Sequence, residues 1–155
     1  MPATEDFFDH VPAALAALAP LLILFECTNA DLIMRYVGTM VVERWGQNMT
    51  GESWPRHNSH LNASHLLANF ALLQAQPCAA HALSAFVTCA GRNLSIETVS
   101  FPLSVREGRP PRIISGTFTL EALGHNEHSQ GWMPPRAIRW IDVGFGIPAT
   151  LPKTP

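Results

Sequence analysis

The stretch RYVGTMVVERWGQNMTGESW (residues 35–54) contains several changes of chain direction within twenty residues. Its first residues are typical of the end of a strand, which Gly38 would break. Thr39 can cap a short helix that Gly46 ends, because glycine readily adopts the left-handed conformation after a helix. Gly51 marks a further turn. The stretch therefore predicts a strand that returns through a short helix and builds one wall of a cavity beside a sheet.

Two strands and a helix are expected before this turn. LLILFECTN (21–29) and LIMRYVG (32–38) are rich in β-branched and aliphatic residues, with turn-forming residues between them. They predict a tight β-hairpin. Residues 4–19 have helical spacing of apolar side chains and acidic residues near their start, and Pro20 would end that helix.

The rest of the chain predicts one long helix followed by strands. Residues 59–76 read as a helix that ends before Pro77. Alternating or β-type patterns then predict three strands, at 80–90, 94–104 and 112–123. Residues 124–135 lose periodicity, and 137–146 form either a short final strand or an extended arm.

Composition limits the class of protein. A chain of 155 residues has the size of one domain, and 47% apolar against 14% charged residues leaves apolar area to place against a partner. We therefore expect self-association. Ten basic residues are scattered among twelve acidic ones, which argues against a nucleic-acid partner.

The cysteines and the N-terminus point to the cytoplasm. Cys27, Cys78 and Cys89 show no paired spacing, so we expect reduced and mostly buried thiols, with neither disulfide nor zinc. The apolar segment 11–25 follows acidic residues and contains two prolines, and it is too short to span a bilayer. We expect neither a signal peptide nor membrane insertion.

Three short segments of the sequence resemble segments of a known protein family. In the first segment (35–51), the matching residues are Arg35, Gly38, Thr39, Gly46, Thr50 and Gly51. With FPLS (101–104) and IDVGFG (141–146), this pattern resembles that of small PAS-like proteins found mainly in alphaproteobacteria. The resemblance covers about 21–148. It implies an α+β, PAS-like fold, with a five-stranded antiparallel sheet and a helical crossover.

The domain limits follow from this resemblance. We expect an N-terminal helix within residues 1–20, a PAS-like domain over 21–148 and a C-terminal tail over 149–155. PAS domains are sensory modules that bind a small molecule or cofactor between the sheet and the crossover, or that mediate protein contacts. The resemblance therefore implies a non-enzymatic sensory module that signals through an unknown protein partner.

Six residues are candidates for lining the ligand pocket. They are Arg35, Trp45, Trp54, Leu66, Phe70 and Phe118. Arg35 can hold a carboxylate, but a structural ion pair with Glu43 or Asp31 is the preferred interpretation. A cavity above about 300 Å³ would favour a ligand. A core filled by Phe70, Trp45 and Phe118 would favour a pure interaction module.

Histidines offer the alternative of a cofactor. His65 lies in the predicted long helix, close to His57 and His60, and other PAS sensors bind haem iron through a histidine on the equivalent helix. A surface or hydrogen-bonded histidine is the preferred interpretation, so no haem is expected. His125 and His128 lack the further ligands that a zinc site needs.

No catalytic motif is present. The chain has no nucleophile elbow, no phosphate-binding glycine loop and no zinc-protease motif. Glu5, Asp6 and Asp9 suit the start of a helix better than acid–base catalysis. We expect no enzymatic activity.

The N-terminal helix predicts a dimer. Its apolar stripe, which includes Val11, Leu15 and Leu18, can cover the sheet, but Phe8 and several alanines lie off that stripe. Pairing two such helices across a two-fold axis would bury both sets. We therefore expect a homodimer held largely by residues 4–19, with Phe8, Val11, Leu15 and Leu18 at the interface.

Overall fold

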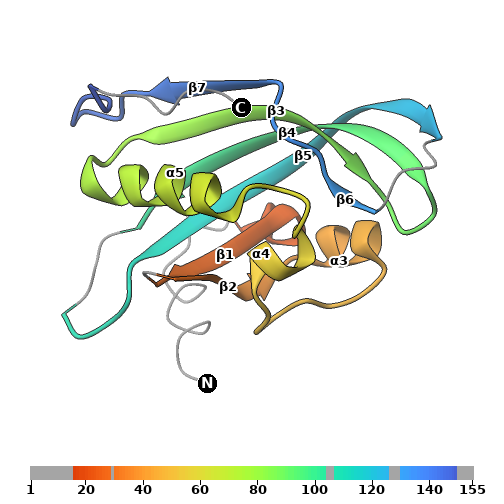
Figure 1. Cartoon of the computed structure of the whole chain (residues 1–155), viewed down its shortest axis with the longest axis horizontal. Coiled ribbons are helices and arrows are strands. Elements are labelled where there is room, and N and C mark those ends of the chain that lie inside the picture. The colour runs from red at the N-terminus through yellow and green to blue at the C-terminus, as the bar shows by residue number, and fades with distance from the viewer. Residues whose placement is uncertain (1–15, 29, 104–106, 126–129, 150–155) are drawn as a thin grey trace.

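The computed structural model describes residues 16–28, 30–103, 107–125 and 130–149. The chain is built mainly from antiparallel sheet, with 43% strand against 22% helix. The sheet curls into half a barrel, and the helices lie on its concave side (Figure 1). No helix among the described residues is both long enough and apolar enough to cross a membrane.

Within the described residues, seven strands form the sheet. They are β1 (Leu22–Cys27), β2 (Leu32–Val37), β3 (Ala79–Val87), β4 (Arg92–Pro102), β5 (Arg112–His125), β6 (Gly131–Trp132) and β7 (Ala137–Ile141). The order across the sheet is β2-β1-β5-β4-β3-β6, and β7 also pairs with β3. β6 pairs with residues 86–87 of β3 and β7 with residues 79–83, so the two short strands follow one another along β3.

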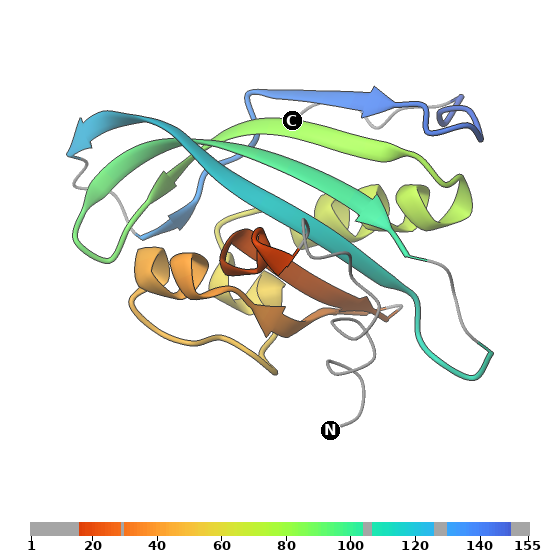
Figure 2. The same ribbon diagram turned by 180° about the vertical axis from the view of Figure 1, so that it is seen from behind.

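The helices lie in the chain between β2 and β3, apart from the 3-10 turn η1 (Ala19–Leu21) that precedes β1. They are α3 (Thr39–Trp45), α4 (Trp54–His57) and α5 (Ala63–Ala75). Asn62 begins α5, because its side-chain oxygen accepts a hydrogen bond from the backbone N–H of His65 at 3.1 Å. Seen from behind, the long strands lie in front of α5 (Figure 2).

The predicted five-stranded PAS-like fold with a helical crossover is wrong. The segments interpreted as strands do form β1 to β5, but the sheet has seven strands and curls. Sequence reasoning missed β6 because two residues are too few to show a period, and it left residues 137–146 open between strand and arm. Register shifts at 93/94 and 95/96 add local twist to β4, which favours a curved sheet over a flat one.

The predicted N-terminal helix lies mostly outside the described residues, as do Phe8, Val11 and Leu15 of the predicted dimer interface. Leu18 is half-buried, and its carbonyl oxygen accepts a hydrogen bond from the backbone N–H of Leu21 at 2.8 Å. The homodimer stays a prediction.

The core consists of two clusters of buried side chains. The larger cluster joins β1 and β2 to α3 and α4, and includes Phe25, Trp45 and Trp54. The smaller cluster is formed by Leu73, Cys78 and Ile113, near the C-terminal end of α5. Phe70 packs against both clusters.

Residue 38 must be glycine because the backbone of residues 19–20 passes very close to it. A Cβ atom at this position would lie 2.3 Å from the carbonyl oxygen of Pro20 and 2.4 Å from that of Ala19. Its own backbone N–H donates to the carbonyl oxygen of Leu22 at 2.8 Å. Gly38 is also the residue that precedes α3, and no side chain caps this helix, so the predicted capping role of Thr39 is wrong.

We predict that Gly38→Ala lowers the free energy of unfolding by about 2–4 kcal/mol, because the added methyl group meets backbone atoms that cannot move independently. Gly51→Ala is the matched control: Gly51 has a φ of 91° but open space around it, so we expect a loss of about 1 kcal/mol from backbone strain alone. Urea denaturation measures both. Equal losses in the two variants would show that the close approach at Gly38 is unimportant.

Glu26 joins three neighbouring strands through two arginines. Its carboxylate accepts a hydrogen bond from Arg35 of β2 at 2.6 Å and from Arg112 of β5 at 3.1 Å. The Glu26 side chain is 10% exposed. The preference for a structural ion pair of Arg35 over a ligand contact therefore agrees with the geometry, but its partner is Glu26 and neither Glu43 nor Asp31.

The pKa of Glu26 is lowered below its usual value. The hydrogen bond from Arg35 is the largest cause, burial opposes it, and the hydrogen bond from Arg112 lowers the pKa further. A carboxyl group whose pKa is lowered by folding stabilises the protein above its unfolded-state pKa. That contribution is lost as pH falls through the folded-state pKa.

We predict that Glu26→Gln destabilises the protein at pH 7 by about 1–2 kcal/mol, because a charged acceptor between two guanidinium groups is replaced by a neutral one. The variant should also lose less stability than the wild type as pH falls below about 4.5. Thermal denaturation at a series of pH values measures this. Glu43→Gln, at an exposed position, is the control, and identical pH profiles for wild type and Glu26→Gln would contradict the assignment.

Candidate ligand-binding cavity

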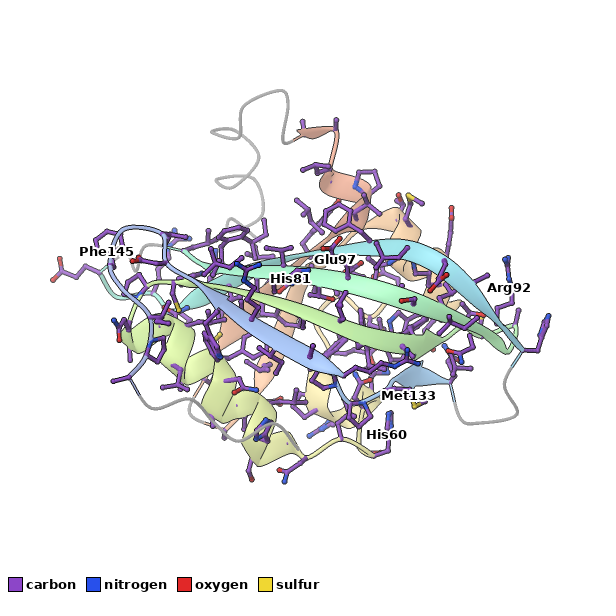
Figure 3. The ribbon with its side chains drawn as sticks, turned by 90° about the horizontal axis from the view of Figure 1, so that it is seen from above. His60, His81, Arg92, Glu97, Met133 and Phe145 are labelled. Carbon is purple, nitrogen blue, oxygen red and sulfur yellow. The ribbon has the colours of Figure 1, made fainter. Side chains whose placement is uncertain are left out.

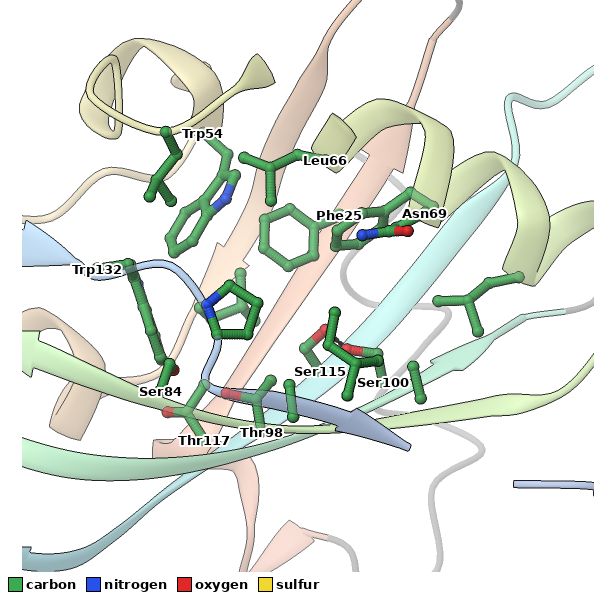
Figure 4. Close-up of a pocket in the computed structure, with 18 of the residues that line it drawn as sticks. Phe25, Trp54, Leu66, Asn69, Ser84, Thr98, Ser100, Ser115, Thr117 and Trp132 are labelled. Carbon is green, nitrogen blue, oxygen red and sulfur yellow. Dashed lines mark hydrogen bonds between the residues drawn. The ribbon is translucent and has the colours of Figure 1, made fainter. Parts of the chain in front are cut away.

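A cavity of about 140 Å³ lies between the inner face of the sheet and α5 (Figure 4). Its lining comes from β1, β3, β4 and β5 on one side and from α4 and α5 on the other. The segment 131–141, which carries β6 and β7, closes a further side. Both core clusters contribute residues, among them Phe25 and Leu73, so the cavity occupies the space between them.

The floor of the cavity consists of two rows of small side chains across three strands. One row is formed by Ala80, Ser100 and Ser115, which are direct partners on β3, β4 and β5. The second row, two residues further along each strand, is formed by Ala82, Thr98 and Thr117. Because alternate strand residues share a face, all six point to the covered side of the sheet. Large side chains at these positions would fill the space.

The roof and walls are apolar and largely aromatic. Leu66, Phe70 and Leu73 of α5 lie at positions i, i+4 and i+7 and face the sheet. Phe25 of β1 packs edge-to-face against Phe70, with ring centroids 5.4 Å apart, and against Trp54 at 5.5 Å. These interlocked rings hold one wall in a fixed position.

The segment 131–141 is attached to the rest of the structure by buried hydrogen bonds. Asn58 is fully buried; its side chain donates to the carbonyl oxygen of Trp54 at 3.1 Å and accepts from the backbone N–H of Trp132 at 3.2 Å. His60 is hydrogen-bonded to the carbonyl oxygen of Trp132. Figure 3 shows His60 at the same end of the molecule as Met133, which bonds to β3 through its backbone N–H.

The polar side chains of the lining fall into two groups. Some have partners: the hydroxyl groups of Ser100 and Ser115 are 2.7 Å apart, and Thr117 Oγ1 accepts from Arg44 at 2.8 Å. In contrast, Asn69 Oδ1 and Thr98 Oγ1 are buried and have no hydrogen-bond partner among the described residues. A buried polar atom without a partner costs about 1–3 kcal/mol of stability.

The described lining contains no ionisable side chain: it has no Asp, Glu, His, Cys, Lys or Arg. Arg44 of α3 reaches the floor through its bond to Thr117, and burial lowers the pKa of its guanidinium group. Such a lining can hold a molecule by shape and hydrogen bonding. It offers no side chain for acid–base chemistry near neutral pH.

Three of the six predicted pocket residues line this cavity: Trp54, Leu66 and Phe70. Trp45 lies in the larger core cluster, where its ring packs against Phe86 with centroids 5.2 Å apart. Phe118 follows Thr117 on β5, and its ring lies beside Gly116, whose added Cβ would be 3.1 Å from it. Phe118 therefore faces away from the cavity, as does exposed Arg35.

Sequence reasoning missed the floor and the wall formed by residues 131–141. Alternation in the segments that form β3 and β5 was visible, but small residues on a strand form no recognisable motif. The signal that could have found the floor is the recurrence of Ala, Ser and Thr at alternate positions of three strands that pair directly. That recurrence can be recognised only once the register is known.

The histidines lie outside the described lining of the cavity. His65 is half-buried on α5, and His57 is hydrogen-bonded to Glu52. His81 and Glu97 bond to each other at 2.5 Å (Figure 3). Among the described residues, which include His125 but not His128, no three His, Cys, Asp or Glu side chains gather as metal ligands.

The three cysteines are free thiols. Cys78 is buried and Cys27 is half-buried, whereas Cys89 is exposed. Burial is the main cause that raises the pKa of Cys27 to about 11, so this thiol is protonated at neutral pH.

No model of a known protein family matches the chain, and a comparison with curated proteins found no match. The resemblance of its short segments to PAS-like proteins therefore stays a prediction, and the fold that it implied is corrected above. The function must therefore be inferred from the cavity itself.

We predict that Asn58→Ala lowers the free energy of unfolding by about 2–3 kcal/mol, because it removes two buried hydrogen bonds and leaves the Trp132 N–H without its acceptor. Amide hydrogen exchange at Trp132 should accelerate more than exchange in β4. Asn48→Ala, at an exposed turn, is the control. Unchanged exchange at Trp132 would show that Asn58 does not hold this segment.

Proposed function

We propose that this protein is a binding module for a small, uncharged, mostly apolar molecule, which it holds in the cavity between the sheet and α5. The observation that supports this most strongly is the floor of small side chains. Three adjacent strands place Ala, Ser or Thr at six directly paired positions under a roof of Leu and Phe. A core that only needed stability would fill this volume, since packed interiors leave few voids larger than water.

The cavity is partly open to solvent, and its inner volume has room for about one ring. Pockets for drug-sized molecules measure about 300–1,000 Å³, and the cavity does not reach the size of about 300 Å³ above which it would favour such a ligand. At about 140 Å³, the cavity is comparable with an engineered apolar cavity of about 150 Å³ that binds benzene. A porphyrin has four such rings, so this volume weighs against haem.

The alternative of a pure interaction module with a filled core has less support. Of the three residues expected to fill the space, Trp45 and Phe118 lie elsewhere and only Phe70 lines the cavity. The absence of ionisable side chains from the described lining supports binding over catalysis.

A sensory role forms part of this proposal. The ligand would contact α5 and residues 131–141 together, whereas the backbone hydrogen bonds of Met133 and Arg136 run to β3. A bound molecule would add packing between them and reduce their independent motion. A signal could pass to a partner protein through that change.

We predict that toluene raises the thermal stability of the wild type, by about 2.7 kcal/mol at a concentration of 100 times its Kd. Ala82→Leu should abolish this effect, because the larger side chain rises from the centre of the floor. Ala71→Leu, at an exposed position of α5, is the matched control and should respond like the wild type. Differential scanning fluorimetry measures the shifts.

Native mass spectrometry of freshly purified protein gives an independent check. A small co-purified molecule should be present in the wild type and in Ala71→Leu, and absent from Ala82→Leu. Equal stabilisation of all three proteins by toluene would contradict binding in this cavity.

A further inference from the structure

Two opposite sides of the cavity each present one polar side chain without a partner. Thr98 projects from β4 and Asn69 from α5 (Figure 4). Thr98 Oγ1 and Asn69 Oδ1 are both buried, and neither makes a hydrogen bond within the described residues. Their neighbours Ser100 and Ser115 satisfy each other, so the lack of partners is confined to part of the lining.

Unpartnered polar groups at these positions destabilise the free protein. Valine has nearly the shape of threonine and leucine nearly that of asparagine, and both would suit the surrounding apolar lining without the cost of an unpaired oxygen. A ligand that supplies the missing hydrogen bonds would recover this cost. The polar atoms therefore indicate which group the ligand carries.

A hydroxyl group fits both partners. The Thr98 hydroxyl can donate and accept, and the Asn69 amide carries an oxygen acceptor and an NH₂ donor. A hydroxyl group on the ligand, which also donates and accepts, can therefore bond to either side chain. A purely apolar ligand would leave both oxygens unpaired.

A charged ligand does not fit. A carboxylate or an ammonium group that enters the cavity loses its hydration, and the described lining itself carries no opposite charge. Arg44, which adjoins the floor, already donates to the hydroxyl and carbonyl oxygens of Thr117. The hydroxyl-bearing molecule must therefore be neutral. The aromatic side chains of Phe25, Trp54 and Phe70 provide ring faces and edges against which an aromatic ring packs favourably.

We propose that the ligand is a neutral, single-ring aromatic compound with a hydroxyl group, which bonds to Thr98 on the β4 side of the cavity or to Asn69 on the α5 side. This inference rests on the proposed function, since it names the class of molecule that the cavity would bind.

Three compounds of similar size separate the possibilities: phenol, toluene and benzoate. Toluene leaves water more readily than phenol, so a purely apolar cavity would bind toluene more tightly. A hydrogen-bond partner for the ligand hydroxyl in the cavity would instead make phenol bind more tightly than toluene. We expect phenol to bind at least tenfold more tightly than toluene, and benzoate to give no measurable binding at neutral pH, by isothermal titration calorimetry with the full chain.

Thr98→Val tests the position of the hydroxyl group. The variant should lose at least fivefold in affinity for phenol and keep its affinity for toluene, while the ligand-free protein melts at the same temperature or higher. Thr119→Val, at an exposed position of β5, is the matched control and should leave both affinities unchanged. Asn69→Leu should show this pattern instead if the hydroxyl lies on the α5 side of the cavity.

The outcomes distinguish the two proposals. If none of the three compounds binds to the wild type, the proposed function itself fails. If toluene binds as tightly as phenol or more tightly, the cavity binds rings but the hydroxyl class is wrong. If phenol is preferred and Thr98→Val and Asn69→Leu both keep its full affinity, the hydroxyl lies elsewhere and the assignment is overturned.

Discussion

The direct pairing of small side chains across β3, β4 and β5 is the constraint on which the cavity depends. Ala82, Thr98 and Thr117 lie opposite one another, and a parallel row of Ala80, Ser100 and Ser115 lies two residues away. A shift of one residue in the β3–β4 or β4–β5 register would turn the small side chains of one strand away from α5. Larger side chains, such as Leu83 or Phe118, would then face the helix. Register therefore determines the volume of the cavity.

The elements around this floor are fixed by interactions outside the cavity. Glu26 joins β1 to β2 and β5 through two arginines, and the close contact at Gly38 fixes the path into α3. Asn58 holds the backbone of Trp132, and pairing of β6 and β7 with β3 keeps residues 131–141 against that strand. These stabilising interactions lie around the cavity, whereas its lining contains the unpaired oxygens of Thr98 and Asn69. Functional sites often retain such locally unfavourable groups.

Local patterns in the sequence predicted most elements but not how they assemble. Alternation and turn residues correctly located the segments that form β1 to β5, and Pro77 correctly marked where the helix α5 ends. The predicted architecture was wrong for two reasons. The strand β6 is only two residues long, and the register shifts in β4, which favour a curved sheet, carry no signal in the sequence. Trp54, Leu66 and Phe70 were assigned to the pocket from apolar character and helical spacing. Trp45 and Phe118 have the same character, and only the backbone decides that they face elsewhere.

A small ring compound should occupy the space between the sheet and α5. Nuclear Overhauser contacts between bound phenol and the protein would locate the ligand without any substitution. We expect contacts from the ring protons to the methyl groups of Thr98 and Leu66. Contacts confined to the exposed apolar side chains of Val143 and Phe145, which lie after β7, would contradict it.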